Sequence, residues 1–106
     1  MISFDDFAKV EMKVGTILEV EEIEGSEKLL KLRVNLGEER PRQILSGIKK
    51  WYKTEKLVGK QFVFVTNLEP RMMMGLESQG MIMAVGDTNP ILLKPASKVS
   101  PGSKVR

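Results

Sequence analysis

The sequence contains no cysteine and no histidine. Without cysteine the chain has no disulfide, no thiolate metal ligand and no cysteine nucleophile. Without histidine it lacks the most common general base, the most common zinc ligand and every serine–histidine triad. No paired-carboxylate motif or glycine-rich phosphate loop takes their place, so we expect no catalysis, no cofactor and no metal site.

Long apolar runs are also missing. No run approaches the roughly 18 residues that span a bilayer, and residues 1–6 have neither the basic nor the apolar region of a signal peptide. We therefore expect no membrane contact and a cytoplasmic location. With 106 residues, of which 42% are hydrophobic and 29% charged, the chain is predicted to form a single domain over residues 1–106.

Charge is distributed unevenly along the chain, although the net charge is only +3. Glutamates crowd the first quarter, whereas residues 88–106 carry four cations and no acid. One interpretation is an ordinary solvated surface, and the other is a basic face for a polyanionic partner. Charge alone does not decide between them.

Alternating apolar and polar residues predict several β-strands. Between Val10 and Val20 the even positions are mostly apolar, and Gly15 suggests a bulge or sharp bend in one long strand. Further strands are predicted at residues 30–36, 42–48, 61–68 and 81–85, with a short edge at 91–93. The strand at 61–68 is apolar on both faces and is predicted to be central.

Two short helical segments complete the predicted fold. Ser3, with Asp6 three residues later, is typical of a capping box, and Thr54 is predicted to cap a short helix that Gly59 ends. Five strands with one short helix between the third and fourth predict an all-β OB-fold barrel. The tail, residues 94–106, has little to bury.

Four blocks of sequence together resemble the tRNA-binding domain family: EGSEKL at 24–29, QILSGI at 43–48, NLEPR at 67–71 and GLESQGM at 75–81. That family includes the C-terminal domain or separate β subunit of methionyl-tRNA synthetases and free-standing structure-specific tRNA-binding proteins. The resemblance extends from about Phe4 to Val105. It implies an OB-fold homodimer that grips the outer corner of tRNA, reads its shape, and lends affinity to a catalytic partner without catalysing aminoacylation.

The resemblance also implies that the N-terminal segment, residues 1–9, makes the dimer contact, which suits the apolar side chains of Phe4 and Phe7. An alternative for that apolar edge is a lid on the barrel. Because the chain begins with its own Met, we expect a stand-alone protein or a separate β subunit with methionyl-tRNA synthetase as its partner.

Several residues are candidates for contact with tRNA. The amide of Asn67 suits a nucleotide edge or a 2′-OH, Arg71 suits phosphate, the Ser78 hydroxyl can reach phosphate, and Met81 offers an adaptable surface to a base or sugar. The alternatives are a turn cap for Asn67, a local hydrogen bond for Ser78 and core packing for Met81. The remaining candidates are cations that together form an electrostatic footprint or are singly solvated: Lys28, Lys31, Arg33 and Arg42.

The run Met72–Met74 departs from the family pattern, in which another cation often follows Arg71. Methionine-rich surfaces suit promiscuous apolar partners, so the alternative function is a peptide-binding, chaperone-like OB-fold module. The leading hypothesis remains a non-catalytic tRNA-binding protein whose partners are tRNA and a second copy of itself.

Overall fold

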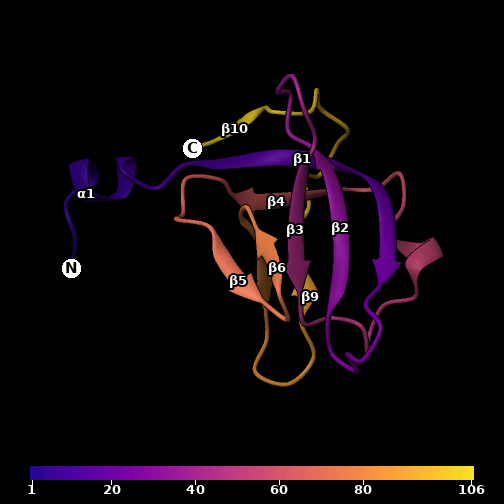
Figure 1. Ribbon diagram of the computed structural model, residues 1–106. Helices are drawn as coiled ribbons and strands as arrows, with labels where there is room; N and C mark the ends of the chain where they lie inside the picture. Colours follow the sequence, from indigo (N-terminus) through magenta and orange to yellow (C-terminus); the bar gives the residue numbers. More distant parts are fainter.

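The computed structural model describes all 106 residues, most of them in or between β-strands (Figure 1). Its elements, in chain order, are α1 (Phe4–Ala8), β1 (Met12–Glu22), β2 (Leu30–Asn35), β3 (Arg42–Ser46), the 3-10 helix η1 (Thr54–Lys56), β4 (Gln61–Val65), β5 (Arg71–Met73), β6 (Leu76–Ser78), β7 (Met81–Ile82), β8 (Ala84–Val85), β9 (Ile91–Leu92) and β10 (Lys104–Val105).

The main sheet is antiparallel and has the order β3-β2-β1-β4-β7, with β10 paired to β1 beyond this path. It curls until its two edges approach each other, and the backbone N–H of Gln79 donates to the carbonyl of Gln43 on β3 at 2.8 Å. The result is a nearly closed, OB-like barrel of five antiparallel strands. The predicted fold class, with a short helix between the third and fourth strands, is confirmed.

β1 is long enough to take part in two sides of the barrel. Its residues 12–16 pair with β4, and its residues 16–22 pair with β2. A Cβ at Gly15 would lie only 2.6 Å from Cγ1 of Val34, so close packing is what requires glycine there. The bulge comes later, between Ile17 and Glu19, where the register with β2 shifts. Ile17, just before the bulge, is fully buried and Leu18 is 41% exposed, and after the bulge Val20 packs against the core. The alternation groups Leu18 with the apolar even positions Val14 and Val20, and its exposure shows that this grouping does not hold.

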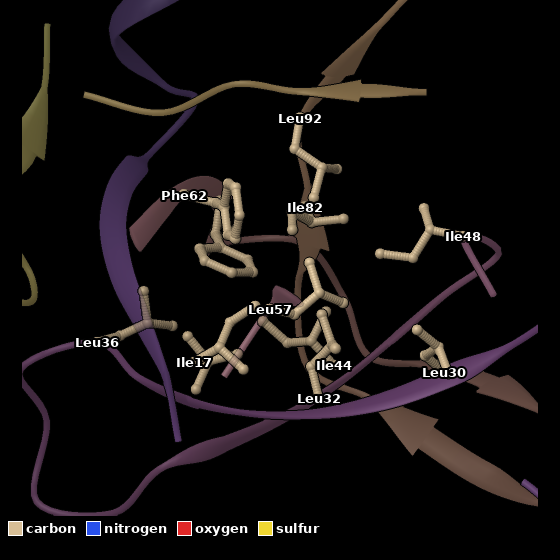
Figure 2. Packing of buried hydrophobic residues seen from close by; sticks show 12 residues of the cluster. Ile17, Leu30, Leu32, Leu36, Ile44, Ile48, Leu57, Phe62, Ile82 and Leu92 are labelled. Atoms are coloured by element: carbon tan, nitrogen blue, oxygen red, sulfur yellow. The ribbon is translucent and has the colours of Figure 1, made fainter. Parts of the chain in front are cut away.

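The barrel interior is filled by aliphatic and phenylalanine side chains that converge from all sides (Figure 2). β2 contributes Leu30, Leu32 and Val34, each at most 1% exposed, as its alternating sequence predicts. β4 lies between β1 and β7 and buries Phe62 and Phe64, which confirms its central position.

The two helical segments, neither of which has a buried residue, differ in how their first turns are capped. The Ser3 hydroxyl accepts a hydrogen bond from the N–H of Asp6 at 3.1 Å, which confirms the predicted cap, but α1 has no buried residue and stands away from the barrel (Figure 1). Lys53, not Thr54, is the N-cap of η1, and no side chain caps it. The predicted capping role of Thr54 is therefore wrong; its hydroxyl donates to Glu55 instead. Gly59, with φ +81°, follows the segment as predicted.

Several strand boundaries differ from the predicted ones. β4 ends at Val65 rather than at residue 68, and the following Thr66 pairs with Glu11. Residues 71–78 form the β5–β6 hairpin, which the alternation does not reveal. The predicted strand 81–85 is interrupted at Met83 into β7 and β8. The tail is fastened to the barrel: β10 pairs with β1, and the N–H of Gly102 donates to Val14.

Neither α1 nor η1 has the length and apolar composition of a segment that crosses a bilayer.

Candidate nucleic-acid interface

The four sequence blocks meet on one side of the barrel, around β3 and the β5–β6 hairpin. The N–H of Leu45 in the second block donates to the Ser78 hydroxyl in the fourth at 2.9 Å. A Cβ at Gly25 in the first block would lie 3.8 Å from Cε of Met74 in the hairpin. We call residues 24–29, 43–48 and 67–81 the motif surface. Segments far apart in the sequence therefore form one continuous region.

Ser78 lies inside this region rather than on it, since it is only 3% exposed. Its hydroxyl accepts from Leu45 N–H and donates to the carbonyl of Gly80 at 3.1 Å. Both ends of the hydroxyl are thus used within the protein, where they hold the end of β6 against β3. A phosphate contact from Ser78 stays a prediction.

Further hydrogen bonds between β3 and residues 77–79 come from two glutamines. The candidate residues do not include them. The N–H of Gln43 donates to the side-chain oxygen of Gln79 at 2.9 Å, and the side-chain amide of Gln43 donates to the carbonyl of Glu77 at 2.8 Å. Both glutamines lie in the sequence blocks, but nothing in their spacing indicates that they pair. Where the barrel closes, between β3 and residues 77–79, hydrogen bonds from side chains therefore take the place of a regular ladder of backbone hydrogen bonds.

Arg42 connects three segments of the chain where the barrel closes. Its guanidinium makes two parallel hydrogen bonds to Glu38, at 2.8 and 2.7 Å, and donates to the carbonyls of Thr66 and Gln79. These four bonds employ most of its donors. Arg42 is held as a structural brace, and its predicted place in an electrostatic footprint is untested.

A carboxylate beside this brace is kept ionised. The Thr66 hydroxyl donates to Glu11 at 2.6 Å and lowers the pKa of that carboxyl, an effect that partial burial opposes. The charges of Lys13 and Arg42 lower the pKa further. Glu11 therefore stays anionic and fixes the start of β1 against the end of β4.

Asn67 joins the loop after β4 to the beginning of the chain. Its side-chain oxygen accepts from the N–H of Glu11 at 2.8 Å, and its amide nitrogen donates to the carbonyl of Lys9 at 2.7 Å. The residue nevertheless remains exposed. Asn67 thus holds the segment that leads to α1, and one lone pair and one N–H of its side-chain amide are not used in these two hydrogen bonds.

The cations on β2 are paired with acids directly opposite them on β1. Lys31 lies 3.1 Å from Glu21 and Arg33 lies 3.5 Å from Glu19. Their charges are largely offset across the strands. Lys28 has no ion pair, but it follows the glutamate-rich turn between β1 and β2. The four predicted strand cations therefore do not form one uncompensated basic face.

Arg71 and Met81 border an apolar hollow of about 600 Å³ between β3 and the β5–β6 hairpin. Leu45, Leu68 and Met73 also line it. Arg71 is exposed and takes part in no ion pair, and Met81 is 47% exposed. A guanidinium beside an apolar hollow provides a charge for phosphate and a surface for a flat base or an apolar side chain.

The hairpin turn beside this hollow is strained. Met74 has φ +51° and Gly75 has φ +76°, the two positive values that a tight type I′ turn demands. For a residue other than glycine or asparagine this conformation costs roughly 1–2 kcal/mol. Met72 and Met74 are 64% and 56% exposed, so the turn presents apolar side chains to solvent at a cost in stability.

Comparison with known proteins assigns the family. The model of the family described as "Putative tRNA binding domain" matches residues 12–104. The chain belongs to this tRNA-binding domain family. It is 52% identical over 106 residues to the methionine–tRNA ligase of Methanoregula boonei and 50% identical over 105 residues to that of Methanococcus aeolicus. These matches cover 99–100% of the chain but only 16% of either ligase, so the chain spans about one-sixth of these curated relatives.

Solved structures agree with this assignment. The MetRS-related protein of Pyrococcus horikoshii has a TM-score of 0.90 and 37% identity, with 100% of this chain and 98% of that chain covered. The chaperone CsaA of Bacillus anthracis has a TM-score of 0.88 and 29% identity, with 100% and 99% covered. The C-terminal domain of Plasmodium vivax p43 has a TM-score of 0.86 and 31% identity, with 94% and 61% covered.

Proposed function

We propose that the protein is a non-catalytic, cytoplasmic tRNA-binding protein that grips the outer corner of tRNA as a homodimer and supports methionyl-tRNA synthetase in trans. The observation that carries the proposal is the assembly of all four family blocks into the motif surface of a chain that belongs to the tRNA-binding domain family. Such a surface, built from several loops, is suited to reading shape rather than sequence.

Within the motif surface we assign direct contact to the exposed residues. Arg71 binds phosphate, Met81 and the adjacent hollow receive a base or sugar, and Asn67 and Lys28 contact the backbone from either side. Arg42 and Ser78 hold the surface in shape through their internal hydrogen bonds. Lys31 and Arg33, which are partly neutralised by Glu21 and Glu19, contribute weakly.

The N-terminal segment supports the dimer part of the proposal. Phe4 is 79% exposed and Phe7 is 39% exposed, and α1 buries none of its residues against the barrel. Exposed aromatic side chains on one short segment are typical of a protein contact. Replacing Phe4 and Phe7 with serine should convert the dimer to a monomer in analytical ultracentrifugation, and a wild-type protein that sediments as a monomer would refute this part.

The trans arrangement rests on the lengths of the relatives. The same fold forms almost the whole chain of the Pyrococcus MetRS-related structure, whereas it forms about one-sixth of the ligases. Co-purification from the native cell, with bound protein identified, tests the partnership; capture of a catalytic methionyl-tRNA synthetase is the expected result.

Binding of labelled tRNA at several salt concentrations tests the central claim. We expect tight binding that weakens by roughly one log–log unit per phosphate contact and weaker binding to unstructured RNA of equal length. Equal affinity for the two RNAs would exclude recognition of shape, and no binding to either would exclude the function.

Substitution of Asn67 tests the best exposed site residue. Asn67→Ala should weaken tRNA binding without unfolding the protein. Because Asn67 also holds Lys9 and Glu11, the oligomeric state must be measured with the affinity. A loss of affinity in a variant that remains dimeric supports direct contact.

A second function has a specific observation in its favour. The apolar hollow and the exposed methionines resemble a surface for polypeptides, and the CsaA structure, described as a chaperone, matches the whole chain. Binding of unfolded peptides that is insensitive to salt, without affinity for tRNA, would establish this alternative.

A further inference from the structure

A polar groove lies at the opposite end of β4 from the motif surface. It has a volume of about 470 Å³ and is formed by the segment from η1 to the start of β4 and by the tail segment 94–98. Its lining includes four lysines and no acidic residue: Lys56, Lys60, Lys94 and Lys98. We call it the lysine groove. By contrast, the hollows beside β1–β2 and around η1 are lined by glutamates as well as lysines.

The charges of the lysine groove are not used within the protein. None of its lysines takes part in the five ion pairs of the structure, which involve Lys9, Lys13, Lys31, Arg33 and Arg42. None donates a side-chain hydrogen bond to another residue either. Glu55, beside Lys56 in the sequence, pairs with Thr54 and lines a different hollow. The groove therefore concentrates positive charge that no ion pair offsets; among its lysines, Lys56 also acts on Glu55, whose carboxyl pKa is lowered by a hydrogen bond with its own backbone and, to a lesser extent, by the Lys56 charge.

Both walls of the groove are fixed. The side-chain amide of Gln61 donates to the carbonyl of Val99 at 2.6 Å and its oxygen accepts from the N–H of Val99 at 3.0 Å, while the N–H of Leu93 donates to Met83 at 3.0 Å. These bonds anchor the segment 94–98 at its two ends. On the other wall, the carbonyl of Lys60 accepts from Ile17 at 3.0 Å. The backbone that carries the lysines is therefore anchored on both sides of the groove.

We propose that the lysine groove is a second anion-binding site, which holds phosphates of the RNA backbone while the motif surface holds the rest of the same RNA. The proposal rests on the tRNA-binding function above. The five residues of β4 span about 13 Å at roughly 3.3 Å per residue, so a ligand that reaches both ends is extended and polyanionic. Lysine suits this task because a flexible point charge binds phosphate without demanding one orientation.

Paired charge-neutralising variants test the proposal. The groove variant carries Lys60→Gln and Lys94→Gln, and the control carries Lys50→Gln and Lys104→Gln, two exposed lysines that do not line the groove and have no ion pair. Both lose the same net charge, and urea unfolding should give equal midpoints. Affinity for tRNA is then measured across salt concentrations.

We expect the groove variant to lose about two units of the log–log salt slope and roughly tenfold or more in affinity near 0.1 M salt. The control should keep most of both. Equal losses in the two variants would refute the groove while leaving the proposed function intact, whereas a wild-type protein that does not bind tRNA would refute both. A second measurement compares the binding of wild-type protein and the groove variant to vesicles containing phosphatidylserine. A groove variant that loses vesicle binding but keeps wild-type affinity for tRNA would assign the site to a membrane and overturn the proposal.

Discussion

The motif surface and the lysine groove lie at opposite ends of β4. Their polar side chains differ in whether the protein itself supplies their hydrogen-bond or ion-pair partners. Ser78 in the motif surface and Arg42 beside it are occupied by hydrogen bonds inside the protein. In the lysine groove Lys60 and Lys94 have no internal partner. The residue type alone is therefore a poor guide to ligand contact. A better guide is whether the charge and the hydrogen-bonding groups of the side chain already have partners within the protein.

The same contrast separates shape from charge. Ser78, which holds β6 against β3, lines a hollow in which an apolar surface is flanked by Arg71. The groove has only two hydrophobic lining residues and a fixed row of cations. A ligand that uses both regions has its form read at one end of β4 and its phosphates neutralised at the other.

The largest effect should come from Ser78→Ala. The change leaves Leu45 N–H and Gly80 C=O without their buried partner, which costs roughly 1–3 kcal/mol of unfolding free energy. The midpoint of urea unfolding measures this cost, with the exposed Ser97→Ala as control. If Ser78 contacts phosphate instead, tRNA affinity falls while the midpoint is unchanged, and the division between bracing and contact fails at this residue.

Arg71 and Arg33 provide the next test, because one is free and the other is ion-paired. Arg71→Gln should reduce the log–log salt slope of tRNA binding by about one unit. Arg33→Gln removes the same charge but should change the slope much less, since Glu19 already offsets it. Equal changes would show that pairing across β1 and β2 does not decide which cations meet the RNA.

The strained turn gives a smaller effect of opposite sign. Met74→Asn should stabilise the protein by about 1 kcal/mol, because asparagine adopts a positive φ more readily. Met72→Asn, on the neighbouring strand, is the control and should not stabilise, since Met72 has no positive φ. A stabilised Met74→Asn protein that binds tRNA more weakly would show that the strain is kept for the ligand.

The sequence predicts those parts of the molecule whose cause is local. The alternation from Leu30 to Val34 is enough to identify β2 and its buried face, and Ser3 is enough to place the start of α1. The bulge after Ile17 is not visible, because it follows from pairing with β2 rather than from a residue type. The four family blocks come together in the fold as the motif surface.

The partners of individual side chains are not predictable in this way. Ser78 bonds to an N–H 33 residues away, so its sequence neighbours do not reveal its burial. The lysine groove is equally hidden, because its two walls are joined by Gln61 and Val99, which are 38 residues apart. Only the folded chain shows which cations are compensated.

The smallest predicted effect tests directly whether an acid paired with a cation keeps that cation from binding phosphate. Glu21→Gln removes the acid that lies 3.1 Å from Lys31 and should free that lysine for phosphate. Because an exposed ion pair of this kind is worth less than about 1 kcal/mol, tRNA affinity should rise only a few-fold and the salt slope by less than one unit. Glu39→Gln, at an exposed glutamate without an ion pair, changes the net charge equally and is the control. Both variants are compared with wild-type protein in the same salt series. If the two glutamates give the same increase, long-range net charge rather than local pairing governs binding, and the distinction between the motif surface and the lysine groove loses its electrostatic basis.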